Sequence, residues 1–253
     1  MTISIITVCY NSVDTIEDTI KSVISQTVFD KIEYIIIDGA SDDGTLDILN
    51  KYKKYFKLIS QKDDGIYDAM NKGIELSNGN TIGFINSDDF YIDNNIIENI
   101  LNKFKSNNIL EGIYCDLFYV SRKNTNKVLR YWKTGSFINN SFKNGWHPAH
   151  PTLFLKKEVY MKYGLFDMDY LLAADFEIML RFIEKFKINI EYYRKPIVKM
   201  RIGGATSKSL KNIIMQNIEI INAFKKNDII TNPFFYFLRR MKSKLTQYLL
   251  KQN

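Results

Sequence analysis

Residues 35–45 read IIIDGASDDGT. Unbroken isoleucine is typical of a parallel strand that helices cover on both faces, so we predict a strand over 33–38 and a polar turn after it. Similar strand-like runs occur nearby, at 3–9, 57–61 and 81–85. Apolar residues at helical spacing separate these strands, at 16–24, 45–55, 67–76 and 93–104. The alternation predicts an α/β fold with a mostly parallel central sheet flanked by helices.

The remainder of the chain is less regular. We predict two paired strands at 112–120 and 128–132, followed by a long loop at 133–151. Beyond the loop we predict helices at 173–186 and 210–225, with a glycine turn at 201–208 between them. A loop as long as 133–151 within a compact domain is usually functional or disordered. These elements divide the chain into a domain over 1–208 and a C-terminal helical extension over 209–253.

The composition is that of an ordinary globular protein. The chain has 253 residues, 45% of them apolar and 25% charged, which excludes a largely disordered chain. Cys9 and Cys115 have no histidine or cysteine neighbours, so we expect reduced thiols. No segment reaches the roughly 18 apolar residues of a membrane span, and no basic leader precedes the first strand. A cytoplasmic protein is therefore expected.

The net charge of +7 is concentrated at the C-terminus. From Lys208 onward the sequence has nine Lys and Arg residues against two acidic ones, so the preceding body is neutral. A basic tail attracts anionic partners, either nucleic acid or phospholipid headgroups. The neutral body lacks the basic and aromatic interleaving of a nucleic-acid groove, so no nucleic-acid partner is expected.

Polar residues follow each of the first four predicted strands, at Tyr10–Asn11, Asp38–Gly44, Asp63–Gly65 and Asn86–Asp89. In an open parallel sheet, ligands bind outside this carboxyl edge. Such residues are also common in plain turns. However, adjacent carboxylates such as Asp88 and Asp89 repel each other, and a bound cation offsets that cost. Two hard oxygen ligands suit Mg²⁺ or Mn²⁺ bridging to a diphosphate.

Other nucleotide-binding and metal-binding motifs do not match. The sequence has neither a P-loop nor a G-x-G-x-x-G after its first strand. An EF-hand over 38–49 fails because Ala40, Asp43 and Leu49 occupy positions that need a ligand, a glycine and a glutamate. A diphosphate held through a carboxylate-bound metal is the reading that remains.

Taken together, these motifs resemble a known family. The pattern at 35–45 is accompanied by ISIITVCYNS at 3–12, DDGIYDAMNKGI at 63–74, GFINSDD at 83–89, HPAHPTLFLKKEVYMKYGLFD at 147–167, AADFEIMLR at 173–181 and MRIGGATS at 200–207. Over roughly residues 2–208 the chain resembles the family 2 glycosyltransferases, which have the Rossmann-like GT-A fold. It is most similar to the bacterial branch that builds O-antigen, capsule and related surface polysaccharides.

The resemblance implies a UDP-sugar donor. The family's donor positions fall on Thr7, Tyr10, Asn11, Asp38, Asp63, Asp64, Asn71, Lys72, Ser87, Asp88 and Arg201. Asp38 is expected to accept a hydrogen bond from uracil. Arg201 and the glycines after it are expected to close over the diphosphate, with a simple turn as the alternative.

The family's D-x-D metal motif falls on residues 86–89 with a substitution. Its first aspartate is Asn86 here, which shifts the binding of Mn²⁺ or Mg²⁺ to Asp88 and Asp89 and leaves open which is the direct ligand. Asp175 matches the catalytic base, which takes the proton from the acceptor hydroxyl in an inverting transfer. A plain helix N-cap is the alternative for Asp175.

The resemblance also indicates an acceptor side. Trp146, His147 and His150 lie in the long loop and are expected to face the acceptor, with ordinary loop histidines as the alternative. Residues 233–253 begin with a proline and place apolar residues on one helical stripe with basic residues mostly off it. Such a helix is typical of binding to an anionic membrane surface, although packing on the domain or a partner subunit is the alternative.

The sequence therefore predicts a metal-dependent, inverting hexosyltransferase. It would move glucose or galactose from a UDP-sugar to a sugar on undecaprenyl diphosphate, at the inner face of the cell membrane. The alternatives are a GT-A transferase with another nucleotide sugar or a non-lipid acceptor, and a non-enzymatic binder of nucleotide or nucleic acid. The sequence does not specify the sugar, the linkage or the oligomeric state.

Overall fold

The computed structural model describes residues 1–203 and 209–249. The described strands are β1 Ile3–Cys9, β2 Ile32–Asp38, β3 Lys57–Ser60, β4 Thr81–Phe84, β5 Phe90–Tyr91, β6 Gly112–Val120, β7 Val128–Trp132, β8 Phe154–Lys156 and β9 Ile190–Arg201. The α-helices are α1 Ile16–Ile24, α2 Thr45–Tyr52, α3 Ile66–Leu76, α4 Ile96–Ser106, α5 Lys157–Tyr163, α6 Ala174–Met179, α7 Leu210–Lys226 and α8 Pro233–Leu249.

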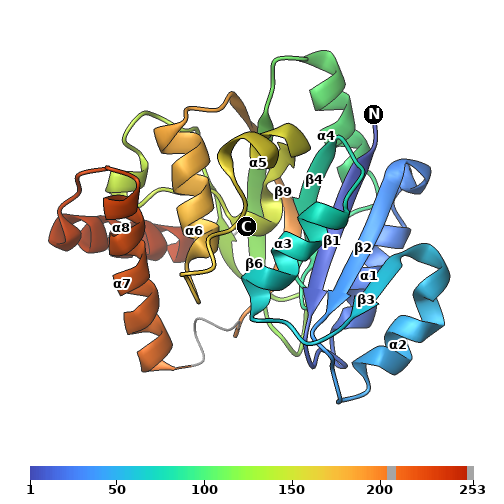
Figure 1. The fold of residues 1–253 in the computed structure, drawn as a ribbon. Helices are drawn as coiled ribbons and strands as arrows, with labels where there is room; N and C mark the ends of the chain where they lie inside the picture. Colours follow the sequence, from blue (N-terminus) through green and yellow to red (C-terminus); the bar gives the residue numbers. More distant parts are fainter. Residues whose placement is uncertain (204–208, 250–253) are drawn as a thin grey trace.

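The strands form one mixed sheet in the order β3-β2-β1-β4-β8-β6-β9-β5, with β7 also paired to β6 (Figure 1). Neighbours from β3 to β4 are parallel, as are β6 and β9. The other pairings, which involve β5, β7 and β8, are antiparallel. The predicted α/β sheet with flanking helices is confirmed, and its parallel part is concentrated in the N-terminal half.

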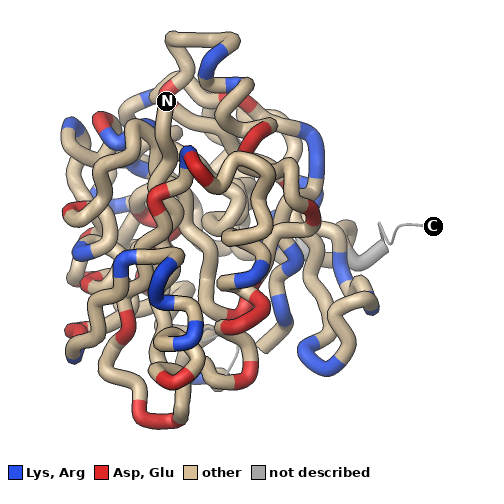
Figure 2. Tube along the Cα trace, turned by 90° about the vertical axis from the view of Figure 1, so that its right-hand side faces the viewer, with Lys and Arg blue, Asp and Glu red and all other residues tan. Residues whose placement is uncertain are grey.

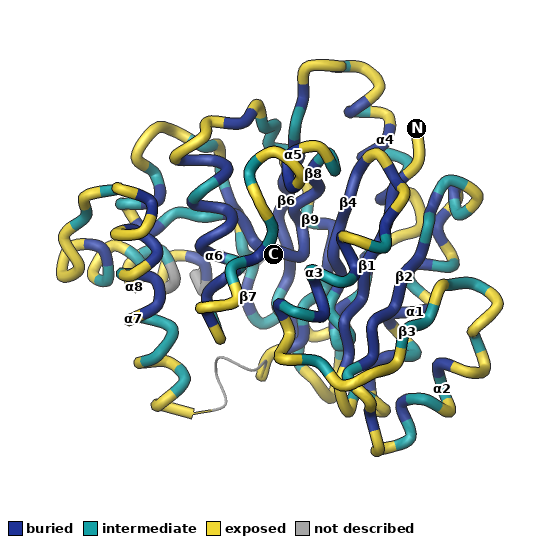
Figure 3. Tube along the Cα trace, viewed as in Figure 1, coloured by how far each residue is buried: buried dark blue, intermediate teal, exposed yellow. Residues whose placement is uncertain are grey.

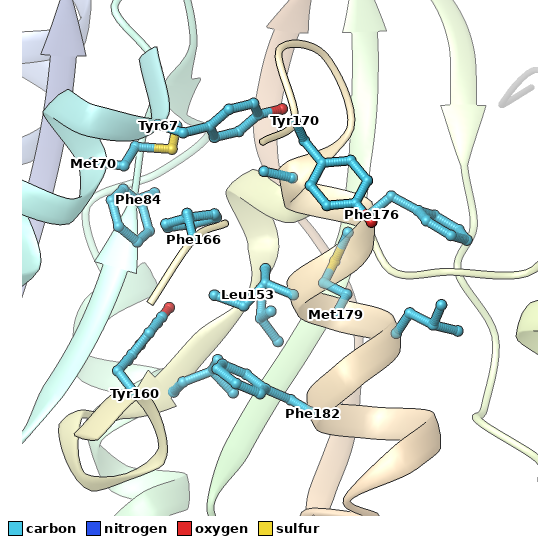
Figure 4. Packing of buried hydrophobic residues seen from close by; sticks show 14 of the residues in the cluster. Tyr67, Met70, Phe84, Leu153, Tyr160, Phe166, Tyr170, Phe176, Met179 and Phe182 are labelled. Atoms are coloured by element: carbon cyan, nitrogen blue, oxygen red, sulfur yellow. The ribbon is translucent and has the colours of Figure 1, made fainter. Parts of the chain in front are cut away.

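Helices cover both faces of the sheet, as the isoleucine-rich strands require. Alternate residues of β1 enter different cores: Ile3 and Ile5 pack with α1, α2 and α4, whereas Ile6 and Val8 pack with α3, α5 and α6. Figure 3 shows the central strands buried along their length, and Figure 4 shows side chains of α3, β4 and α6 meeting in one cluster.

Several elements depart from the expectations. The short elements β5, β8 and α5 were not predicted, and neither was β9. In β9, Pro196 lies opposite Asp116, where the register with β6 shifts. The predicted helix over 173–186 is α6 followed by a π-helical segment, Leu180–Lys185.

The C-terminal helices lie beside α6, at the far side of the molecule from β3 (Figure 1). Helix α8 begins at Pro233, as predicted, and its Tyr236 is fully buried against Phe224 and Phe176. The extension therefore packs on the domain. The predicted glycine turn at 201–208 lies outside the described residues from 204 onward, as do residues 250–253 of the tail.

The helices over residues 1–203 and 209–249 include none whose length and hydropathy would allow it to cross a bilayer.

Gly73 allows α3 to lie against β1, because a β-carbon there would be 2.5 Å from Cγ2 of Ile6. We predict that Gly73→Ala lowers the free energy of unfolding by about 1–3 kcal/mol, since overpacking outweighs the better helix propensity of alanine. Urea unfolding measures the change. Glu75→Ala, at an exposed position of the same helix, should stay within about 0.5 kcal/mol of wild type. A Gly73→Ala variant as stable as wild type would contradict this packing.

Candidate active site

The turns after β1, β2 and β4 are joined by hydrogen bonds at the carboxyl edge of the sheet. The amide of Asn11 donates to Oγ of Ser41 at 2.9 Å, which links the turn after β1 to the turn after β2. The hydroxyls of Ser12 and Ser87 lie 2.9 Å apart and link the turns after β1 and β4. The structure thus brings together the turns that the sequence predicted at one edge.

Two of the residues predicted to contact the donor, Thr7 and Asp38, lie beneath this edge. Thr7 is fully buried, and its hydroxyl shares a hydrogen bond of 3.1 Å with Tyr34. Asp38 is also fully buried, and its carboxylate accepts hydrogen bonds from Ser41 and Ser60. These hydrogen bonds fix the turn after β2 through Asp38, and its contact with uracil stays a prediction.

Tyr10 and Asn11 are the exposed part of the predicted nucleoside region. Tyr10 is 64% exposed, and its side chain lies beside Gly39, as does the carboxylate of Asp63. Each comes within 3.4 Å of the position that a β-carbon of Gly39 would take. The side-chain amide of Asn11 is bound to Asp42. An aromatic ring and a carboxylate therefore both lie close to the backbone of Gly39, at the turn after β2.

The start of α3 contributes a charged cluster. Lys72 forms ion pairs with Asp63 at 2.6 Å and Asp68 at 2.7 Å, and these hydrogen bonds raise the pKa of Lys72 to about 12. Asp64 is exposed next to this pair. The amide of Asn71 instead brackets the backbone of Phe166, with two hydrogen bonds of 2.9 Å. Asn71 therefore holds a neighbouring loop, and its place beside the donor stays a prediction.

The turn at Asp88 and Asp89 gives the two carboxylates different surroundings. Asp89 is fully buried; its oxygens accept from Nδ2 of Asn86 at 2.8 Å and from the backbone amide of Arg201 at 3.2 Å. Burial, together with the nearby charge of Asp88, raises the pKa of Asp89 well above its usual range. The Asp88 side chain is 25% exposed, and its Oδ2 is 3.9 Å from Nη1 of Arg122.

Arg201 clamps this turn from inside. Its Nη1 donates to the backbone carbonyl of Asp88 at 2.6 Å, and its Nη2 pairs with Asp18 of α1. The residue is 4% exposed, so the prediction that it closes over a diphosphate is corrected. Arg122, in the hairpin between β6 and β7, is the exposed cation beside Asp88, and the sequence reading missed it.

A metal at this turn is left with one accessible carboxylate. Within residues 1–203 and 209–249, no group of three or more His, Cys, Asp or Glu side chains is arranged to hold an ion. Mg²⁺ typically binds through one or two carboxylates together with substrate phosphates, and that mode fits Asp88. Asp89 is fully buried and each of its oxygens accepts a hydrogen bond, so Asp88 is the more accessible of the two carboxylates.

Asp175 lies in the first turn of α6, half-buried opposite the polar edge. Its Oδ1 accepts hydrogen bonds from the amide of Phe176 at 2.8 Å and the hydroxyl of Tyr67 at 3.3 Å. Oδ2 accepts none from the described residues. Burial raises the pKa of Asp175 above its usual value. A carboxylate with one oxygen held and the other open can receive a proton.

The three predicted acceptor residues lie in different surroundings. The ring centroid of His147 lies 5.1 Å from that of Trp132 and 5.5 Å from that of Phe176, the residue that follows Asp175 in α6. Trp146 donates from Nε1 to the carbonyl of Thr134 at 2.7 Å, and aromatic side chains surround its indole.

His150 is buried between Phe84 and Phe166, with ring centroids 5.2 and 5.5 Å away. Burial lowers the pKa of this histidine to about 4, so it is neutral. A ring enclosed in this way packs in the core, and the predicted contact of His150 with the acceptor is corrected.

Asp116 of β6 holds the acceptor-side loop and was not singled out from the sequence. Its carboxylate accepts from the hydroxyls of Tyr131 and Tyr192 and from the amide of Thr134, each at 2.7 Å. An aspartate in a strand of otherwise apolar residues was the available signal. Trp132 and Tyr67 were also missed, because their roles depend on contacts across the fold.

Comparisons with known proteins agree with this fold. The model of glycosyl transferase family 2 matches residues 4–164. An uncharacterized glycosyltransferase of Mycobacterium tuberculosis is 29% identical over 71% of this chain and 68% of its own. The UDP-Glc:alpha-D-GlcNAc-diphosphoundecaprenol beta-1,3-glucosyltransferase WfaP of Escherichia coli is 39% identical over 39% of each chain.

A solved structure extends the comparison to the fold. S. aureus TarS 1-349 in complex with UDP-GlcNAc aligns with a TM-score of 0.69 over 96% of this chain and 71% of that one, at 14% identity. The family model covers more than half of the chain and agrees with the motifs at the carboxyl edge. The chain therefore belongs to glycosyl transferase family 2 and has the GT-A fold.

Proposed function

We propose that this glycosyltransferase moves a hexose, glucose or galactose, with inversion from a UDP-sugar to a sugar on undecaprenyl diphosphate during surface polysaccharide synthesis. The observation that carries the proposal is the half-buried Asp175, with one oxygen held and the other open, opposite the polar edge. The donor class is supported by the UDP-sugar named for WfaP and by the UDP-GlcNAc bound to TarS. The acceptor class is supported by the name of WfaP.

The donor would lie over Gly39. Tyr10 would stack on the uracil, and Asn11 and Asp64 would contact the nucleoside from the rim. Lys72, with its raised pKa, stays charged and would orient Asp63. The diphosphate would then extend toward Ser87 and Asp88, where Arg122 offers a second positive group.

We propose Asp88 as the ligand of Mn²⁺ or Mg²⁺ and Asp89 as a support of the turn that carries it. The metal, when bound, would neutralise charge on the departing UDP. Arg201 fixes the turn through the Asp88 carbonyl and the Asp89 carboxylate, so Asp88 is held in place before a ligand arrives.

Asp175 would take the proton from the acceptor hydroxyl as the acceptor oxygen attacks the anomeric carbon. Tyr67 and the Phe176 amide fix Oδ1, which leaves Oδ2 to face the hydroxyl. The raised pKa of Asp175 brings its basicity closer to neutral pH, where a general base is most effective. His147, held between Trp132 and Phe176, would contact the acceptor sugar.

Helix α8 would carry the membrane contact at the inner face of the cell membrane. Tyr236 faces the core, while Phe234, Leu238, Met241 and Leu245 form an exposed stripe at helical spacing. Lysines and arginines accompany this stripe, whereas over the domain body basic and acidic positions are interspersed (Figure 2). An apolar stripe with basic flanks suits an anionic bilayer surface. In this proposal residues 1–208 are the transferase domain and 209–253 the membrane-proximal extension.

Calorimetry of UDP binding tests the donor site. Wild type should bind UDP more tightly with Mn²⁺ than without it, and Asp88→Ala should lose the metal-dependent part because the proposed ligand is gone. Asp30→Ala, at an exposed position before β2, should bind as wild type does. The donor proposal would be wrong if wild type bound no UDP under either condition.

Asp175→Asn tests the base. We expect turnover to fall about 100-fold to 10,000-fold, the range of general-base catalysis, while UDP affinity stays unchanged because Asp175 is not proposed to contact the donor nucleotide. Transfer assays with a panel of UDP-sugars provide the measurement. Asp169→Asn, in the exposed loop before α6, is the control and should retain activity. Strong residual turnover in Asp175→Asn would exclude this role.

Vesicle sedimentation tests the exposed stripe. The double variant Leu238→Gln, Met241→Gln should associate at least about tenfold more weakly with vesicles containing anionic phospholipid, because burying each apolar side chain favours binding by about 1.5–3 kcal/mol. Met161→Gln, which changes an even more exposed methionine on α5, should leave binding intact. Equal association of all three proteins would argue against membrane contact through α8.

A further inference from the structure

Helix α7 fixes the backbone that leads into the base. The buried carboxylate of Glu219 accepts hydrogen bonds from the amides of Leu171 at 3.1 Å and Leu172 at 2.8 Å. These residues end the loop directly before α6, whose first turn contains Asp175. The approach of the chain to Asp175 is therefore set by a residue in the C-terminal extension.

Helix α8 brings an arginine to the same region. Arg240 donates from Nη1 to Asn217 of α7 at 3.3 Å. Its backbone passes so close to Gly145 that a β-carbon there would lie 2.8 Å from it, and Trp146 and His147 follow Gly145 directly. One turn earlier on α8, the ring of Tyr236 lies 6.4 Å from that of Phe176. Arg240 thus lies between α7 and the acceptor-side loop, one helical turn from the tyrosine that packs on α6.

The guanidinium of Arg240 is not fully used by the fold. Its Nη1 donates to Asn217, whereas its buried Nε has no acceptor at hydrogen-bond geometry among the described residues. The hydroxyl of Tyr236 lies beside the same guanidinium. A buried donor without an acceptor is costly.

This place brings the positive charge of Arg240 toward Asp175. Burial raises the pKa of Asp175, and the hydrogen bonds from Phe176 and Tyr67 and, after them, the charge of Arg240 oppose the rise. The other groups that face this carboxylate are the hydroxyl of Tyr67 and the amide of Phe176. Nearby, Glu177 is paired with Arg181, and His147 touches the ring of Phe176.

We propose that α7 and α8 are a working part of the active site, in which Glu219 positions the 171–172 backbone and Arg240 supports the ionised Asp175 carboxylate. Both are positioning residues, since neither is placed on the substrate. The inference rests on the proposed role of Asp175 as the base, and it gives the extension a task separate from membrane contact.

The first test needs no substrate. The full-length protein is labelled with carboxyl-¹³C aspartate, and the Asp175 resonance is identified by its loss in Asp175→Asn. Its titration should shift to higher pH in Arg240→Met, because the stabilising charge is removed, and should move back toward wild type in Arg240→Lys. Arg239→Met, which removes the neighbouring exposed arginine, should leave the titration in place. An unchanged Asp175 titration in Arg240→Met would overturn the proposal.

The second test uses turnover in detergent-free solution with a soluble acceptor, so that membrane contact plays no part. A base works when ionised, so the rate falls as the pH drops through its pKa; the acidic limb of Arg240→Met should therefore lie at higher pH than that of wild type. Glu219→Gln should lower kcat about tenfold with an unchanged KM for the donor, because one strong acceptor of the two amides becomes a weaker one. An acidic limb that stays in place, or a loss confined to KM, would count against positioning.

The two tests separate this inference from the function itself. If wild type transfers no sugar from any UDP-sugar but the Asp175 titration still moves in Arg240→Met, the proposed function fails and the coupling stands. If transfer proceeds and the titration does not respond, the coupling fails and the proposed function stands.

Discussion

Parallel pairing of β1 with both β2 and β4 is the constraint on which the rest of the molecule depends. The register sets Cys9 beside Asp38, and Ile6 beside Phe84, so the turns that follow these strands must meet at one edge. The proposed donor site depends on these turns lying side by side. The second half of the sheet adds β6 and β9 alongside, and Arg201 at the end of β9 binds the Asp88–Asp89 turn to them. The polar edge is thus held by the strands below it and by a buried guanidinium from the side.

Much of this fold follows from local pattern, and the first half follows almost completely. Isoleucine runs predict β1 and β2, and proline predicts the start of α8, because these signals act within a few residues. The site is less predictable. A sequence places Asp38 and Arg201 at strand ends, yet whether a side chain faces ligand or interior depends on its neighbours. For Arg201 the decisive partners are Asp18 and Asp88, more than a hundred residues away along the chain. The ring of His150 faces the interior because Phe84 and Phe166 pack against it.

The acceptor side is built around a balance between burial and charge. Desolvation makes Asp175 a stronger base, while hydrogen bonds and a nearby cation keep its ionised form accessible. Asp116 is buried as well, but three donors saturate it and it only anchors a loop. Asp89 also accepts two hydrogen bonds, but they go to its two different oxygens, and a second carboxylate lies close by. The three aspartates therefore differ in whether one oxygen is left without a donor, which is the case only for Asp175 among them.

Helix α8 has two unlike sides, and this limits what trimming the protein can reveal. Tyr236 fills a space lined by Phe176 and Phe224, so removing the helix would uncover aromatic rings of the main core. A protein without α8 would lose the exposed apolar stripe of that helix but expose apolar surface of the core, and it would tend to self-associate. Loss of function after truncation would report damage to the interior as readily as loss of a membrane contact. Substitutions confined to the outward side of the helix are the way to separate the two.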